Sequence, residues 1–275
     1  MLKPSFNPEQ THERSCLFSS AKKKTNHKAM ALEFALDAAK TGNLDALVTA
    51  LASHPHLIDT PHPDKRKTPM YIAAENGHVE FMAKLVELGS HAIDTPDNIG
   101  STPMYAAAWN GHVSSIETLV RLGSKAIDTP NNYGWTPMIT AAQKGHVSAI
   151  ETLVRLGSTA IDTPNDGWTP MYAAAEYGNV SSIETLVRLG STAIDTPNNQ
   201  GWTPMYAAAN NGFATAIETL VRLGSVAIDT PNNHGRGPML AAAYKGHVAA
   251  IEALPASSVR LPCLKQLSRD MCQRS

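Results

Sequence analysis

Histidines and aspartates recur along this 275-residue chain, and they are the side chains whose chemistry could support catalysis or metal binding. If each of these recurring residues belongs to a different stacked helical unit, equivalent residues in neighbouring units lie about 10 Å apart. A metal–nitrogen bond measures only about 2 Å. The members therefore cannot share an ion or act as a catalytic pair. We expect each histidine to order a turn between helices and each aspartate to bond its own Thr-Pro turn. The columns are His78, His112, His146 and His247, and Asp94, Asp128, Asp162, Asp195 and Asp229.

One local cluster of ligand-type residues lies in the segment 54–64, as His54, His56, His62 and Asp64. Metal-dependent activity at this link is a remote alternative, because its three prolines predict a stiff, irregular connection. The sequence contains no nucleophile elbow, zinc-binding helix, phosphate loop or dinucleotide fingerprint. We therefore predict no enzymatic activity, no cofactor and no metal.

The elements that must position these residues are repeats. Thr-Pro-Met occurs at 68–70, 102–104, 136–138, 169–171 and 203–205, followed by a degenerate Gly-Pro-Met at 237–239. The spacings are 34, 34, 33, 34 and 34 residues, and a fixed period in this range indicates a solenoid of stacked units. The predicted fold class is an all-α repeat solenoid of helix-turn-helix units joined by hairpin-like links.

Local rules outline each unit. The threonine supplies an N-cap hydroxyl and the proline occupies the first helical position, where its missing N–H does no harm. A short Met-Tyr-Ala-Ala-Ala helix follows, a glycine ends it, and a second helix such as 113–122 carries apolar residues at helical spacing. Turn-forming residues then lead to the next Thr-Pro.

These residues resemble the ankyrin repeat, as in Gly134-Trp135-Thr136-Pro137-Met138, Ala141-Ala142 and Gly145-His146. Tetratricopeptide repeats share the period, but they have two long helices with proline near the end of the unit. The family's histidine after leucine is replaced here, mostly by Tyr71, Tyr105, Tyr172 and Tyr206, whose hydroxyls could substitute for it. Most units also carry one residue more than the family's usual length, and we place it in the link.

We predict three regions: a disordered basic arm at 1–29, an ankyrin repeat domain of about seven units at 30–254, and an irregular basic tail at 255–275. The first unit is a diverged cap, and Pro255 should truncate the last one. The arm carries +4 and the tail +3, leaving −8 on the repeats, which disfavours nucleic-acid binding along the array. Cys16, Cys263 and Cys272 all lie outside the repeats, and no apolar run is long enough to span a membrane. We expect a monomer in the cytoplasm, with delivery to a host cytosol as a further option.

Differences between units mark positions that stacking does not dictate. They fall before Thr-Pro, at the tip of the link and at the end of the first helix, and the resemblance places all three on the concave face. We predict a non-catalytic scaffold that binds a partner protein there, although the tryptophans could instead only stiffen the array. The alternative is a regulatory or host-directed, effector-like interaction protein whose basic arm carries targeting. The predicted partner-binding residues are Trp109, Tyr133, Trp135, Trp168, Tyr177, Trp202, His234 and Arg236.

Overall fold

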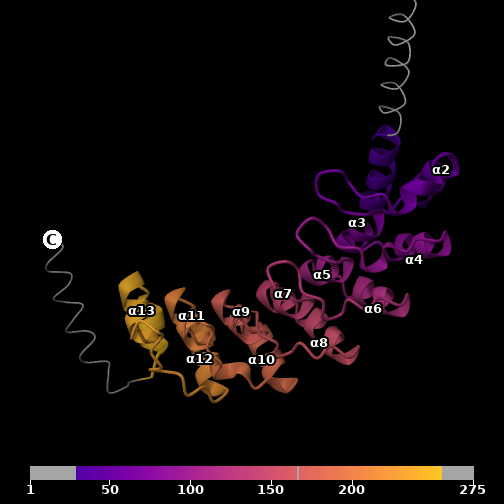
Figure 1. The fold of residues 1–275 in the computed structure, drawn as a ribbon. Helices are drawn as coiled ribbons and strands as arrows, with labels where there is room; N and C mark the ends of the chain where they lie inside the picture. Colours follow the sequence, from indigo (N-terminus) through magenta and orange to yellow (C-terminus); the bar gives the residue numbers. More distant parts are fainter. Residues whose placement is uncertain (1–28, 166, 256–275) are drawn as a thin grey trace, which may run out of the picture.

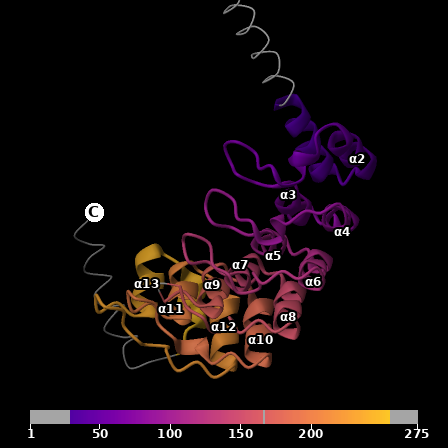
Figure 2. The ribbon, with the colours of Figure 1, turned by 45° about the vertical axis from the view of Figure 1, so that its right-hand side comes forward.

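The chain forms a curved stack of helix pairs (Figures 1 and 2). The structure is a computed structural model that describes residues 29–165 and 167–255. The first helices of the units lie side by side on the inner side of the curve, and the second helices form the outer layer. Within the described ranges no strands are formed, which confirms the expected all-α solenoid.

The elements follow one another as helix pairs, with three short 3-10 turns between them. After the helix at 29–41 they are α2 (Leu44–Ser53), η1 (Pro55–Asp59), α3 (Pro69–Asn76), α4 (Val79–Glu87), η2 (Ala92–Asp94), α5 (Pro103–Trp109), α6 (Val113–Arg121), α7 (Pro137–Lys144), α8 (Val147–Arg155), α9 (Pro170–Glu176), α10 (Val180–Arg188), η3 (Ala193–Asp195), α11 (Pro204–Asn210), α12 (Ala214–Arg222), α13 (Pro238–Lys245) and α14 (Val248–Ala253).

Each first helix begins at its Thr-Pro step. In α5 the Thr102 hydroxyl accepts a hydrogen bond from the backbone N–H of Tyr105 at 3.2 Å, and Pro103 follows as the first helical residue. The same cap recurs in α3, α7, α9 and α11. In α13 the threonine is replaced by Gly237, which offers no side-chain cap. A threonine cap typically contributes about 1 kcal/mol to helix stability, so α13 lacks a contribution that the other five first helices have.

Most of the core is a continuous layer between the two rows of helices, and a small second cluster of Ala35, Ala50 and Leu57 lies at the N-terminal end. The methionine after each Thr-Pro is buried in every unit, and alanines fill the space beside it. Because alanine side chains are small, neighbouring first helices can pack closely. The main cluster thus extends along the array from unit to unit, as expected for a solenoid.

The links project as fingers on the concave side (Figure 2). In the finger 131–135, Asn131 Oδ1 accepts from the backbone N–H groups of Tyr133 and Trp135, and the Asn131 N–H donates to the Trp135 carbonyl at 3.1 Å. Neighbouring fingers also touch: the N–H of Asn132 donates to the Ile99 carbonyl at 2.9 Å. Gly100 has a φ of +79°, and a Cβ there would come within 2.3 Å of Asn132 Oδ1. Glycine is therefore required both by the backbone conformation and by the stacking of fingers.

The single 33-residue unit is shortened in its finger, as predicted. Asn165 and Trp168 exchange backbone hydrogen bonds of 3.0 and 2.7 Å across two intervening residues, whereas three separate Asn131 from Trp135. The deletion thus shortens the finger by one residue and leaves the helices α8 and α9 intact.

The two ends of the array differ from the middle. At the N-terminal end the helix 29–41 and α2 pack beside α3 and expose Met30, Phe34 and Val48. At the other end α14 ends at Ala253, two residues before Pro255, and has 6 residues, whereas α12, the second helix of the preceding unit, has 9. The predicted arm, apart from residue 29, and the tail beyond 255 lie outside the described residues. Among the described helices, none is long and apolar enough to cross a bilayer.

Candidate functional site: the concave face

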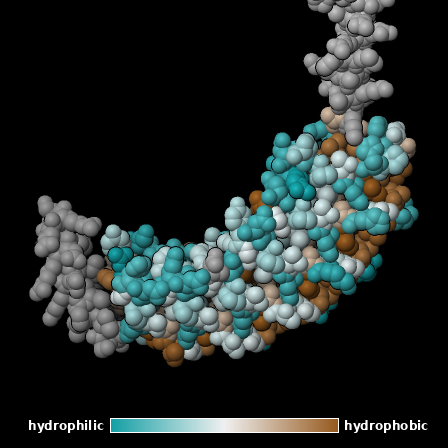
Figure 3. All heavy atoms as spheres, in the orientation of Figure 1, coloured by the Kyte–Doolittle hydropathy of each residue, from teal (hydrophilic) through white to brown (hydrophobic). Residues whose placement is uncertain are grey.

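The concave face is built from the fingers and the first helices. Hydrophilic residues cover much of this side in Figure 3, and the hydrophobic residues visible in that view lie mainly toward the outer margin. The predicted partner-binding residues all belong to fingers or to the ends of first helices.

The four tryptophans are half-buried, and each contacts another aromatic ring. The rings of Trp135 and Trp168 lie 6.0 Å apart between centroids, and Trp168 packs on Tyr172 at 4.8 Å. Trp202 stacks on Tyr206 at 5.4 Å with an interplanar angle of 19°. We call Trp109, Trp135, Trp168 and Trp202 the aromatic stripe. The tryptophans of the stripe are only partly exposed, because each indole packs against another aromatic ring of the array.

Trp109 contacts an aromatic ring and a basic side chain. Its ring stacks on Tyr105 at 6.2 Å, and the Nζ of Lys144 in the next unit lies 3.8 Å from its centroid. An ammonium at this distance makes a cation–π contact. An indole on this face therefore already binds a basic side chain of the protein itself.

The remaining predicted residues are exposed. Tyr133 is 63% exposed and Tyr177 48%, and His234 and Arg236 lie in the last finger. The backbone N–H groups of His234 and Arg236 donate to Asn232 Oδ1 at 2.9 and 3.0 Å. These hydrogen bonds fix the backbone positions of both residues in the finger.

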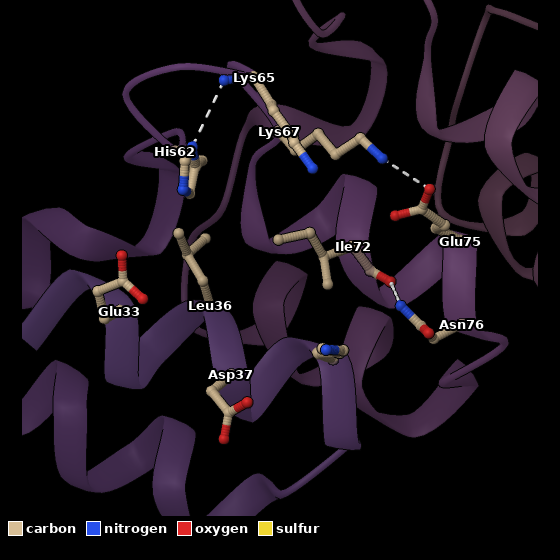
Figure 4. A pocket seen from close by; sticks show the side chains of 10 residues that line it. Glu33, Leu36, Asp37, His62, Lys65, Lys67, Ile72, Glu75 and Asn76 are labelled. Carbon is tan, nitrogen blue, oxygen red and sulfur yellow. Dashed lines mark hydrogen bonds and ion pairs between the residues drawn. The ribbon is translucent and has the colours of Figure 1, made fainter.

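Two adjoining depressions lie on the N-terminal part of the concave face, which the sequence did not single out as a pocket. The first has a volume of about 380 Å³ and lies between the helix 29–41, the finger of His62 to Lys67, and α3 (Figure 4). The second has about 470 Å³ and continues toward Trp109. Both are lined by Lys65, Lys67 and Glu75, so they form one groove, which we call the N-terminal groove.

An ion pair crosses the N-terminal groove. Lys67 Nζ lies 2.6 Å from Glu75 Oε1 and 4.8 Å from the centre of the Tyr71 ring. Burial raises the pKa of Tyr71, and the carboxylate of Asp97 adds to this effect. The tyrosine that replaces the family's usual histidine thus packs as a buried ring beneath the fingers.

Glu176 is the last residue of α9, the first helix of its unit. Burial raises its pKa to about 7, and its Oε2 atom has no hydrogen-bond partner among the described residues. The Nε1 of Trp202 is likewise buried without a partner in this part of the chain. From the sequence, position 176 was identified only as one of the variable positions at the end of a first helix. Its burial could not be predicted, because it depends on neighbouring units.

The prediction that each aspartate of the column bonds its own Thr-Pro turn is wrong. Asp94 does not bond its own Thr-Pro turn: its carboxylate accepts from Ser124 Oγ at 2.5 Å and from the Lys125 N–H at 2.8 Å, both in the next unit. The equivalent contacts recur at Asp59, Asp128, Asp162 and Asp195. The column therefore joins consecutive units through a side chain that reaches forward along the array.

The histidine column also joins units. His146 Nε2 lies 3.1 Å from the carbonyl of Trp109, at the end of the preceding first helix, and His78 and His112 make equivalent contacts. Since a carbonyl oxygen only accepts, this ring nitrogen carries the proton. The histidines thus order the turns as expected, by bonding the helix end one unit earlier.

The residues of the link 54–64 are used locally. His62 Nδ1 accepts from the N–H groups of Asp64 and Lys65 at 3.2 and 3.4 Å, and the rings of His54 and His56 meet edge to face at 6.0 Å. Across residues 29–165 and 167–255, no group of three or more His, Cys, Asp or Glu side chains is arranged to hold a metal ion. The link thus forms a turn in which the His62 ring accepts hydrogen bonds from the backbone.

Comparisons with known proteins agree with this architecture. A family model of ankyrin repeats in three copies matches residues 35–130, 122–198 and 189–260. No curated protein sequence matches the chain significantly. The human ASB11 ankyrin repeat domain is 26% identical with a TM-score of 0.66, covering 83% of this chain and 95% of that one.

The ankyrin repeat domain of Bcl-3, a member of the IκB family, is 21% identical with a TM-score of 0.64, covering 81% of this chain and 98% of the other, a likeness of fold. Domains of this kind generally serve as protein–protein interaction modules and not as enzymes. The resemblance read from the Thr-Pro repeats is thereby confirmed, and the chain belongs to the ankyrin repeat family.

Proposed function

We propose that this protein is a non-catalytic scaffold that holds a partner protein against its concave face. The observation that carries the proposal is the aromatic stripe, whose indoles are fixed by ring contacts yet keep part of their surface open. Tryptophan is enriched among the residues that dominate binding energy at protein interfaces. Because the rings are already ordered, their side chains lose little conformational entropy when a partner binds.

The proposed contact surface extends from Trp109 to the last finger. It comprises Trp109, Tyr133, Trp135, Trp168, Tyr177, Trp202, His234 and Arg236. We propose that the protein acts as a monomer in the cytoplasm, and light scattering after gel filtration tests the first part. Targeting by the basic arm stays a prediction from the sequence, and deletion of residues 1–28 tests it separately from partner binding.

The test is selection of binding peptides from a random display library on the full chain. The triple variant Trp135→Ala/Trp168→Ala/Trp202→Ala should lose the selected peptides, while its circular dichroism remains that of the wild type. A matched control, Leu88→Ala/Val226→Ala, truncates two exposed apolar side chains on other parts of the surface. This control variant should still bind the selected peptides. Equal binding by all three proteins would show that the tryptophans only stiffen the array.

A further inference from the structure

Glu176 is equivalent to Glu75, which forms an ion pair in its own unit. Three units earlier, the equivalent positions are Lys67, Tyr71 and Glu75, where the ammonium meets both the carboxylate and the ring. In the later unit these positions are Trp168, Tyr172 and Glu176. The carboxylate and the tyrosine are kept, and the basic side chain is replaced by an indole.

The surroundings of Glu176 explain its burial. The wall of the N-terminal groove contributed by the next unit includes Ser101 and Tyr105, whose equivalents are Trp202 and Tyr206. At the equivalent positions of the later unit, two indoles thus replace a lysine and a serine, and they pack on Tyr172 and Tyr206 beside the carboxyl group. Apolar surface of this kind excludes water from a carboxyl group and raises its pKa. Tyr206 is close enough to Tyr172 to contribute to the rise of its pKa, so the two stacked units meet at this point.

A carboxylate in such a place favours a cation. Its Oε2 is buried without a partner among the described residues, while the side chain as a whole is only half-buried. The contact of Lys144 with Trp109, and that of Lys67 with Tyr71, show that aromatic rings of this face accept basic side chains. A guanidinium suits the combination best, because it can stack on an indole while its N–H groups donate to a carboxylate.

We propose that Glu176, Trp168 and Trp202 form a subsite for an arginine side chain of the partner protein. The inference rests on the proposed function, because it assumes that a partner binds the concave face, and it adds the chemistry of that partner. In the subsite the carboxylate accepts from the guanidinium, and the indoles cover its faces. The arginine thereby supplies the positive charge that Lys67 supplies in the unit of α3 and α4.

The test compares peptides selected from a random display library on the full-length wild type, on Glu176→Gln and on Glu218→Gln. Glu218 is an exposed carboxylate of α12, in the outer helix layer, and its variant controls for the loss of one negative charge. Peptides selected on the wild type and on Glu218→Gln should be enriched in arginine at one position. The enrichment should disappear with Glu176→Gln, whose side chain has nearly the same shape.

A synthetic peptide then isolates the contact. Replacing its enriched arginine by citrulline, which is neutral and of similar shape, should weaken binding to the wild type by about tenfold or more, as for a hydrogen bond to a charged group. The same change should have little effect on binding to Glu176→Gln, and this double-mutant cycle assigns the loss to the pair. Circular dichroism of the variant confirms that it is folded.

The outcomes separate the two proposals. Peptides that require the tryptophans but show no basic preference, or whose arginine matters equally to Glu176→Gln, would overturn the arginine subsite and leave the scaffold function standing. If no peptide is selected, or if those selected bind independently of the tryptophans, both proposals fail.

Discussion

Ser124 Oγ donates a 2.5 Å hydrogen bond to Oδ1 of Asp94, which lies 30 residues earlier in the chain. The second carboxylate oxygen accepts from the Lys125 N–H at 2.8 Å, so one aspartate fixes the end of the next helix pair. Because the contact repeats from unit to unit, the stacking depends on side chains outside the apolar core as well as within it.

Asp128→Ala should lower the free energy of unfolding by about 1.5–3 kcal/mol, because Ser158 Oγ and the Thr159 N–H would lose a charged acceptor. Urea denaturation followed by circular dichroism measures the change. Thr129→Ala, which alters an exposed neighbouring side chain, should stay within about 0.5 kcal/mol. Equal stability of Asp128→Ala and the wild type would show that the column is dispensable.

The ion pairs of the outer helix layer should contribute far less. Arg188 Nη2 lies 2.5 Å from Glu151 Oε1, but both side chains are more than 40% exposed. Solvent screening limits such pairs to less than about 1 kcal/mol, so Glu151→Gln should change the midpoint of urea unfolding only slightly. A loss as large as that of Asp128→Ala would mean that these pairs act as a cooperative network.

One unit of the chain has an asparagine at the position of the histidine column. Asn179 occupies the position of His146 one unit later, and its Nδ2 donates to the carbonyls of Ala142 and Gln143 at 3.1 and 2.6 Å. His146→Asn should therefore retain most of the stability, whereas His146→Ala should lose about 1–2 kcal/mol by leaving the Trp109 carbonyl without its donor. Thermal unfolding of both variants checks this, and the prediction fails if they melt together.

The first finger contains a residue in an unfavourable backbone conformation. Arg66 has a φ of +54°, whereas the corresponding position in the other fingers is a glycine such as Gly100 or Gly134. Since the left-handed region costs a non-glycine residue about 1–2 kcal/mol, Arg66→Gly should raise the free energy of unfolding by about 0.5–1 kcal/mol after the added chain entropy is subtracted. Lys65→Gly, next to it and without a positive φ, should instead destabilise the protein.

Stability should fall as pH rises through the titration of Glu176. Its folded pKa of about 7 exceeds the unfolded value near 4.5, so between these values the folded state binds more protons and loses stability with rising pH. Because the side chain is only half-buried, solvent screening reduces the full linkage energy, and we expect a loss of about 1 kcal/mol.

Urea unfolding of wild type and Glu176→Gln at pH 5 and pH 8 measures this loss. The variant should show a smaller decrease than the wild type over that range. The raised pKa is contradicted if both proteins respond to pH in the same way.

Local rules were sufficient for the units themselves. The threonine cap and the following proline start each first helix, and glycine beyond its last turn ends it, because these effects involve residues no more than about four positions apart. Periodicity of the Thr-Pro step was likewise enough to recognise the family and to place the shortened finger at 163–168.

Contacts between units were beyond the reach of such rules. The sequence placed the aspartates in a column but could not show that Asp94 accepts a hydrogen bond from Ser124 of the next unit. The aromatic positions were visible as differences between repeats, yet the pairing of Trp135 with Trp168, 33 residues later, depends on how neighbouring fingers stack.

The sequence by itself therefore determined what each unit is and how many follow one another, because helix starts, helix ends and turns are set by neighbours along the chain. Only the tertiary structure decided the burial of Glu176 and the identity of the side chains that face it. Burial depends on which surfaces are brought together when units stack, and residues more than thirty positions apart meet only there.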